Sequence, residues 1–140
     1  MKAYFDTSFL VALIVEDPHS DRANAFLRDQ QPEIGVSDFA ATEFAAVIAR
    51  QVRMGMTKAE AAKATFADFD AWLYLFAESA ETSSQDVRSA AAFIRRLDLN
   101  LRAPDALHIA IAQRIGATLA TFDERMAANA AALGSAVAAA

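Results

Sequence analysis

Short apolar segments alternate with helical segments along nearly the whole chain, and this alternation limits the fold more than any other feature. Strands are predicted at Lys2–Asp6, Glu33–Val36 and Ala117–Thr121, with weaker patterns at Glu78–Thr82 and Ser135–Ala138. Apolar residues at helical spacing predict helices between these segments. Strands that alternate with helices favour an α/β sandwich with a short central parallel sheet flanked by helices.

Capping residues and helix breakers set the expected limits of the helices. Thr7 or Ser8 is expected to cap a helix through Val15, and Ser37 a helix through about Met54. Further helices are expected at 19–30, from a capping box at 57–60 to about 77, from a Ser84 cap to 97, at 105–115 and at 124–133.

Length and composition narrow the class of protein. We expect residues 1–140 to form a single domain, whose Ala-rich part, residues 127–140, is frayed at its end. The chain has no cysteine, which excludes a disulfide scaffold and a thiolate zinc site. Its longest strongly apolar run, Phe9–Val15, is far shorter than the roughly 20 residues that cross a bilayer. We therefore expect a soluble, cytoplasmic protein without membrane contact, and its net charge of −5 argues against binding nucleic acid through bulk charge.

Four acidic residues are expected near one edge of the predicted sheet. They are Asp6 at the end of the first strand, Glu43 within the apolar stretch 39–49, Asp105 at a helix start, and Asp123 after the strand 117–121. Ligands of open parallel sheets bind beyond the carboxyl ends of the strands. Carboxylates that converge there repel one another unless a cation neutralises them, and oxygen ligands without thiolates suit Mg²⁺ or Mn²⁺.

Each of these acids also has an interpretation that involves no ligand. Asp6 and Asp123 fit turn or capping residues, and Asp105 suits the positive end of a helix dipole. An ion pair with Arg50 or Arg53 would account for Glu43. These interpretations weaken when four acids are taken together, because each acid is expected to face the same edge or the apolar side.

Four segments, taken in order, resemble a known family. They are Tyr-Phe-Asp-Thr-Ser at 4–8, Ser-Asp-Phe-Ala-Ala-Thr-Glu-Phe at 37–44, Ala-Pro-Asp-Ala-Leu-His-Ile-Ala-Ile-Ala at 103–112, and Ala-Thr-Phe-Asp-Glu at 120–124. The set resembles PIN-domain proteins, and within them the VapC-type toxins of bacterial toxin–antitoxin pairs. The resemblance covers residues 1–137.

This resemblance implies a PIN-like sandwich and a Mg²⁺-dependent endoribonuclease, with Mn²⁺ as a substitute ion. The acidic residues of the family map onto Asp6, Glu43, Asp105 and Asp123, which would be both metal ligands and catalytic residues. Thr7 or Ser8, and Thr121, match the hydroxyl positions that would hold these carboxylates in place. The resemblance also implies a homodimer, an RNA substrate, and a cognate VapB-like antitoxin that masks the site.

Other residues and functions stay open at this level. Arg102 is a candidate contact for a substrate phosphate. His108, three residues after Asp105, fits either a metal ligand or acid–base group, or a packed histidine on an apolar helix. The apolar segment Phe66–Phe76 is a candidate surface for another subunit. The alternatives to an RNA nuclease are a binding module that does not cut nucleic acid and a metal-dependent DNA nuclease, because the acids do not read the sugar.

Overall fold

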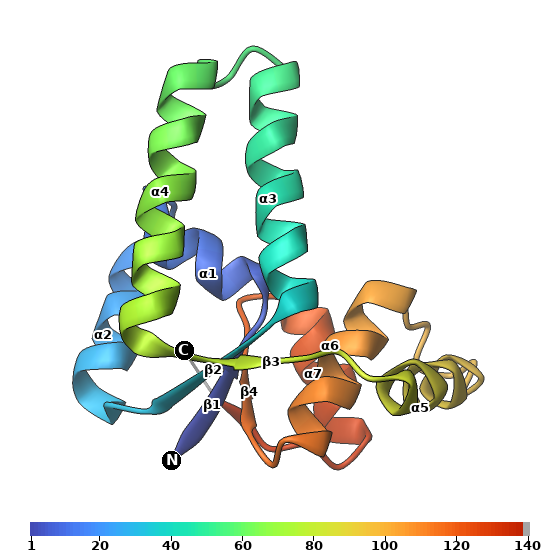
Figure 1. Cartoon of the computed structure of the whole chain (residues 1–140). Helices are drawn as coiled ribbons and strands as arrows, with labels where there is room; N and C mark the ends of the chain where they lie inside the picture. Colours follow the sequence, from blue (N-terminus) through green and yellow to red (C-terminus); the bar gives the residue numbers. More distant parts are fainter. Residues whose placement is uncertain (139–140) are drawn as a thin grey trace.

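The computed structural model describes residues 1–138, which form a parallel five-stranded sheet with helices on both faces (Figure 1). The strands are β1 (Lys2–Phe5), β2 (Glu33–Ser37), β3 (Ala77–Ala80), β4 (Thr118–Ala120) and β5 (Val137–Ala138). The helices are α1 (Thr7–Ile14), α2 (Ser20–Gln30), α3 (Asp38–Arg53), α4 (Ala59–Phe76), α5 (Ser84–Ile94), α6 (Ala103–Arg114) and α7 (Glu124–Ala132). The predicted α/β sandwich with a central parallel sheet is confirmed.

The sheet has the strand order β3-β2-β1-β4-β5, so β1 lies at its centre. β1 is buried on both faces, because Phe5 belongs to one hydrophobic core and its neighbour Tyr4 to the other. The first core packs the sheet against α1–α4 and the second packs it against α5–α7. β2 pairs with one edge of β1, and β4, which comes later in the chain, pairs with its other edge. The strand order therefore reverses at β1.

The C-terminal end of the described chain is ordered into elements. The Ala-rich region provides most of α7 and the short edge strand β5, which pairs with β4. The expected fraying concerns residues 139 and 140, which lie outside the described residues. Within residues 1–138, no helix is both long enough and apolar enough to span a membrane.

Several predicted helix starts were wrong by one or two residues. α2 begins at Ser20 and not at His19, and α6 begins at Ala103 and not at Asp105. α4 begins at Ala59 after Lys58, which makes no side-chain capping bond, so the capping-box pattern at 57–60 is not used. Ser83, not Ser84, caps α5, because Ser83 has the extended backbone that a capping residue adopts. β3 likewise starts earlier than predicted, since its parallel register with β2 places Ala77 opposite Ile34.

Helices α3 and α4 form a long antiparallel hairpin that stands away from the sheet (Figure 1). In the predicted contact segment 66–76, Phe69 is buried in the hairpin, where its ring stacks on Phe44. Tyr74, Leu75 and Phe76 at the end of α4 are largely exposed, with Tyr74 90% accessible. The segment thus divides between the core and the surface.

An ion pair between a buried carboxylate and an arginine fixes α5 against α6. Asp86, only 1% exposed, accepts hydrogen bonds from Arg114 Nε at 2.7 Å and Nη2 at 3.0 Å. The same Asp86 completes a capping box with Ser83, and Arg114 also donates to the carbonyl of Glu81 at 2.7 Å. Burial alone would raise the pKa of Asp86, but the hydrogen bonds from Arg114 and Ser83 outweigh it and hold the pKa below its ordinary value.

Replacing Arg114 by Met should lower the free energy of unfolding by about 2 kcal/mol, because the buried Asp86 carboxylate loses its cation. Urea unfolding at pH 7 measures this change. Arg88→Met is the matched control, since Arg88 is exposed and bonds to Gln85 of its own helix. Its effect should stay within about 0.5 kcal/mol. Equal effects of the two substitutions would contradict a structural role of the Asp86–Arg114 pair.

Candidate active site

The carboxyl ends of β1 and β4 meet where the strand order reverses, and Asp6 lies there at the end of β1. Its carboxylate is 2% exposed and caps α1, with Oδ1 accepting a hydrogen bond from the Phe9 amide at 3.0 Å. The expected cap at Thr7 or Ser8 was therefore wrong by one or two positions. The residue before the helix has the extended backbone that directs its side chain to the first helical amides.

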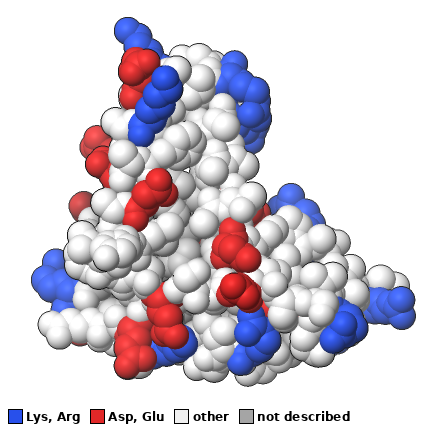
Figure 2. Space-filling view, viewed as in Figure 1, with Lys and Arg blue, Asp and Glu red and all other residues white. Residues whose placement is uncertain are grey.

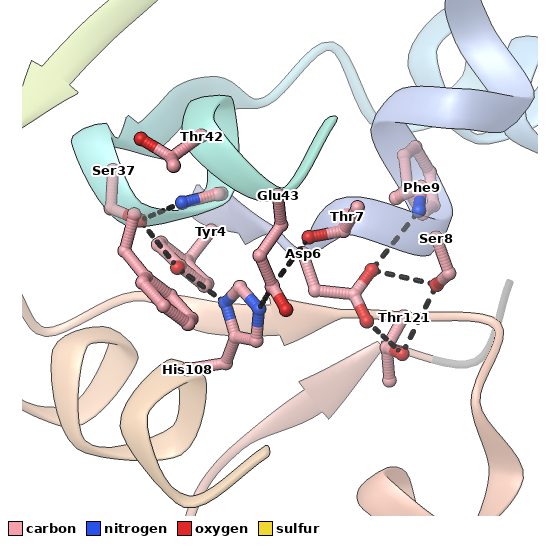
Figure 3. Close-up of polar contacts among 12 residues, drawn as sticks. Tyr4, Asp6, Thr7, Ser8, Phe9, Ser37, Thr42, Glu43, His108 and Thr121 are labelled. Atoms are coloured by element: carbon pink, nitrogen blue, oxygen red, sulfur yellow. Dashed lines mark hydrogen bonds and ion pairs between the residues drawn. The ribbon is translucent and has the colours of Figure 1, made fainter. Parts of the chain in front are cut away.

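Two hydroxyl groups complete the surroundings of Asp6 (Figure 3). Ser8 donates to Oδ1 at 2.7 Å, and Thr121, which follows β4, donates to Oδ2 at 2.5 Å. Both hydroxyls were expected to hold a carboxylate in place, and the geometry agrees with that expectation. Burial still raises the pKa of Asp6 above its ordinary value, although the three hydrogen bonds and the nearby His108 oppose the rise.

The turn between β4 and α7 is tied to the same point. Ser8 Oγ accepts a hydrogen bond from the Phe122 amide at 2.9 Å, and Thr121 Oγ1 accepts one from the Asp123 amide at 3.0 Å. The Phe122 ring stacks with Phe9 and with the imidazole of His19, with centroids 4.9 and 4.6 Å away. These contacts fix the backbone that carries Asp123.

Glu43, half-buried on α3, is held by two residues from other elements (Figure 3). Its Oε1 accepts a hydrogen bond from the Thr7 hydroxyl at 2.7 Å and is in contact with Nε2 of His108 on α6. The suggested ion pair with Arg50 or Arg53 does not form. Burial would raise the pKa of Glu43, but the hydrogen bonds from His108 and Thr7 outweigh it and lower the pKa.

His108 continues a chain of hydrogen bonds into the core. Its Nδ1 lies 2.7 Å from the hydroxyl of Tyr4, which lies 2.8 Å from Ser37 Oγ. The bonds are consistent if Nε2 donates to Glu43, Nδ1 accepts from Tyr4, and Tyr4 accepts from Ser37. Ser37 in turn caps α3 by accepting from the Ala40 amide at 2.9 Å. Tyr4 and Ser37 were not among the residues predicted for the site, although a buried tyrosine hydroxyl in a central strand needs a partner.

Asp105 lies in the first turn of α6 and is half-buried. Its pKa is raised by burial first, and then by the negative charges of Asp123 and Glu43. The positive charge of Arg102 and the nearby His108 side chain act in the opposite direction. Asp105 is thus within electrostatic range of two of the other predicted site residues. Asp123 itself caps α7, because its carboxylate accepts a hydrogen bond from the Met126 amide at 2.9 Å, which confirms the capping interpretation of this residue.

The residues present suit a divalent cation by their chemistry. Within residues 1–138, no three His, Asp or Glu side chains already lie close enough to one another to hold a metal ion. In the same part of the chain, no Lys or Arg nitrogen lies within 4.0 Å of the carboxylates of Asp6, Asp105 or Asp123. Asp6 and Asp105 have raised pKa values, and all the candidate metal ligands are carboxylate oxygens. This is the set of groups that Mg²⁺ or Mn²⁺ would stabilise.

Comparison with known proteins agrees with this fold. The family model described as "PIN domain" matches residues 3–132, and the chain belongs to the PIN domain family. Over 137 residues it is 31% identical to Ribonuclease VapC46 of Mycobacterium tuberculosis, covering 96% of this chain and 94% of that protein.

Solved structures show the same fold. The crystal structure of Mycobacterium tuberculosis VapC20, a Sarcin-Ricin loop cleaving toxin, matches with a TM-score of 0.74 at 18% identity, covering 99% of this chain and 100% of that chain. A toxin–antitoxin complex from Klebsiella pneumoniae matches with a TM-score of 0.58 at 21% identity, covering 86% and 85%.

Without metal, replacing Asp6 by Asn should raise the melting temperature by about 3 °C at pH 7.5 in EDTA. The raised pKa means that the folded state binds the Asp6 proton more tightly than the unfolded chain. In the parent, the stability that Asp6 contributes is therefore fully present below the ordinary aspartate pKa. It is lost as pH rises through the raised pKa of the folded state. Asp6→Asn removes this loss, so its stability should fall less between pH 4 and pH 8.

Asp70→Asn is the charge-matched control, because Asp70 is exposed in the middle of α4. It should melt within about 1 °C of the parent. A folded Asp6→Asn protein that melts clearly lower than the parent in EDTA would mean that the Asp6 carboxylate serves the fold.

Proposed function

We propose that this protein is a Mg²⁺-dependent endoribonuclease, with Mn²⁺ as a substitute ion, and the toxin of a toxin–antitoxin pair. The observation that carries the proposal is the Asp6 carboxylate, buried at the strand-order reversal without a Lys or Arg partner among the described residues. Membership of the PIN domain family and the similarity to proteins named ribonucleases support the choice of RNA.

In this proposal, four acids hold the ion. Asp6, Asp105, Asp123 and Glu43 would be the ligands of the ion. When bound, a divalent ion lowers the pKa of a water molecule and stabilises the negative charge that develops on the phosphate.

The protein's own contribution is to orient these carboxylates. Ser8 and Thr121 prevent the Asp6 carboxylate from rotating, because each hydroxyl donates to a different oxygen. His108 and Thr7 hold Glu43, so that its remaining lone pairs are available to a metal or to a water molecule. Arg102, exposed and close enough to lower the pKa of Asp105, is in place to contact a substrate phosphate.

Partners follow from the proposed role as a toxin. A cognate VapB-like antitoxin would cover the acidic site, and a homodimer would form through exposed apolar residues such as those at the end of α4. The structural similarity to a toxin–antitoxin complex supports the first of these partners. We place the protein in the cytoplasm, where its RNA substrate and its antitoxin would be found.

Metal binding can be measured independently of cleavage. The melting temperature of the parent should rise with Mg²⁺ concentration, and an ion at about 100 times its Kd would add about 2.7 kcal/mol of stability. Asp6→Asn and Asp105→Asn should lose most of this rise, whereas Asp70→Asn should keep it. A parent protein whose melting temperature does not respond to Mg²⁺ or Mn²⁺ up to about 10 mM would contradict a metal site.

Cleavage is tested by expressing the parent and Asp105→Asn in parallel and sequencing RNA 5′ ends within minutes. The parent should arrest growth and create new ends, and co-expressed antitoxin should prevent both. Asp105→Asn should create at least 100-fold fewer new ends, because a lost metal ligand removes transition-state stabilisation. Equal growth and identical RNA ends in the two strains would favour a binding module that does not cut. New ends in DNA alone would indicate a DNA nuclease.

A further inference from the structure

A groove extends from the proposed active site along α3 toward the tip of the hairpin. It has a volume of about 280 Å³ and is lined by Thr7, Glu43, Ala46, Val47, Arg50 and Arg53. Thr7 and Glu43 form its inner end, beside the carboxylates described above. The two arginines form its outer end, with a small and a medium apolar side chain between the two ends.

Helix periodicity places these residues on one side of α3. Arg50 is seven residues and Arg53 ten residues after Glu43, so they lie about 10 and 15 Å further along the axis. Figure 2 shows cationic side chains on the outer part of α3, and Arg50 and Arg53 are the basic residues of that helix. Arg50 and Arg53 therefore line the same groove as Glu43.

Both arginines have their charge available. Arg50 and Arg53 are exposed, and no carboxylate among residues 1–138 lies within 4.0 Å of either guanidinium. Glu43, the acid that shares the groove with them, is already held by Thr7 and His108. A protein with a net charge of −5 thus keeps two unpaired cations beside its acidic site.

We propose that Arg50 and Arg53 bind phosphates of the RNA strand on one side of the phosphate to be cleaved. The proposal rests on the function proposed above. A strand that places one phosphate at the acids must carry its next phosphates away from them, and the groove offers cations at successive distances. Contacts to phosphates position a strand without reading its bases, so these arginines should increase affinity without selecting a sequence.

A purely structural role for the arginines makes a different prediction. Both lie in the last turn of α3, where a positive charge stabilises the helix dipole. In that case their removal would lower stability slightly and leave RNA affinity unchanged. RNA affinity therefore distinguishes the two roles.

The experiment measures binding of a labelled single-stranded 12-mer RNA by fluorescence anisotropy, in an Asp6→Asn background that prevents cleavage. Replacing Arg50 and Arg53 together by Gln should raise the Kd at least tenfold at low salt. It should also reduce the slope of log Kd against log salt by about 1.4, which is about 0.7 for each lost phosphate contact to a single strand. The Lys double variant should recover most of the affinity, which shows that the loss comes from charge and not from misfolding.

Arg88→Gln with Arg95→Gln is the matched control, because both arginines are exposed on and after α5 and the net charge changes equally. It should change the Kd less than twofold. Equal Kd values for the groove variant and this control would overturn the proposal, as would a parent that does not bind RNA. Loss of antitoxin binding with unchanged RNA affinity would also overturn it and would assign the groove to a protein partner.

Cleavage of the same RNA by the unmodified protein in Mg²⁺ separates this proposal from the proposed function. If the parent cuts RNA and the groove variant binds and cuts like the control, the groove proposal fails and the function stands. If the parent does not cut but the groove variant loses affinity, the groove binds RNA and the nuclease proposal fails.

Discussion

The burial of the Asp6 carboxylate is the constraint on which the rest of the site depends. A buried carboxylate without hydrogen bonds would cost several kcal/mol, and here three donors reduce that cost. They come from the first turn of α1 and from the residue after β4, which are far apart in the sequence. The arrangement of β1, α1 and the β4–α7 turn is therefore the arrangement that satisfies this one group. The remaining unfavourable energy, visible in its raised pKa, is what a bound cation would relieve.

Glu43 is stabilised by a different route from Asp6. Its partner His108 belongs to a chain of hydrogen-bonded side chains that runs through Tyr4 and ends at Ser37, the cap of α3. Three elements are thus connected by polar contacts through an otherwise apolar core, and no buried side-chain nitrogen or oxygen among the described residues lacks a partner. Asp105 and Asp123 are less buried than Asp6. The pKa of Asp105 is raised mainly by burial and by the negative charge of Asp123.

Much of the fold follows from local sequence, because the strands are short apolar segments with clear boundaries and the helices have regular periodicity. The predicted strands also placed Asp6 at the end of the first strand and Asp123 after the strand 117–121, near one edge of the sheet. Exact helix starts were harder. Ser83 and Ser84 are equally good capping residues by type, but Asp86 stands three residues after Ser83 and completes a capping box with that serine. The contact of Glu43 with His108, 65 residues apart, depends on how α3 and α6 pack against the sheet. Local sequence patterns carry no information about this packing, so the nearby Arg50 and Arg53 were the natural ion-pair partners to consider for Glu43.

The single continuous helix α3 carries three different kinds of group: the cap at its base, the acid in its second turn and the cations in its last turn. Because nothing interrupts the helix, their relative directions are set by the number of residues between them. One inserted residue between Glu43 and Arg50 would turn the arginines by about 100° around the axis, away from the acid's side. The length of this segment is therefore a fixed quantity, and among homologous chains it should vary less than the lengths of the surface turns.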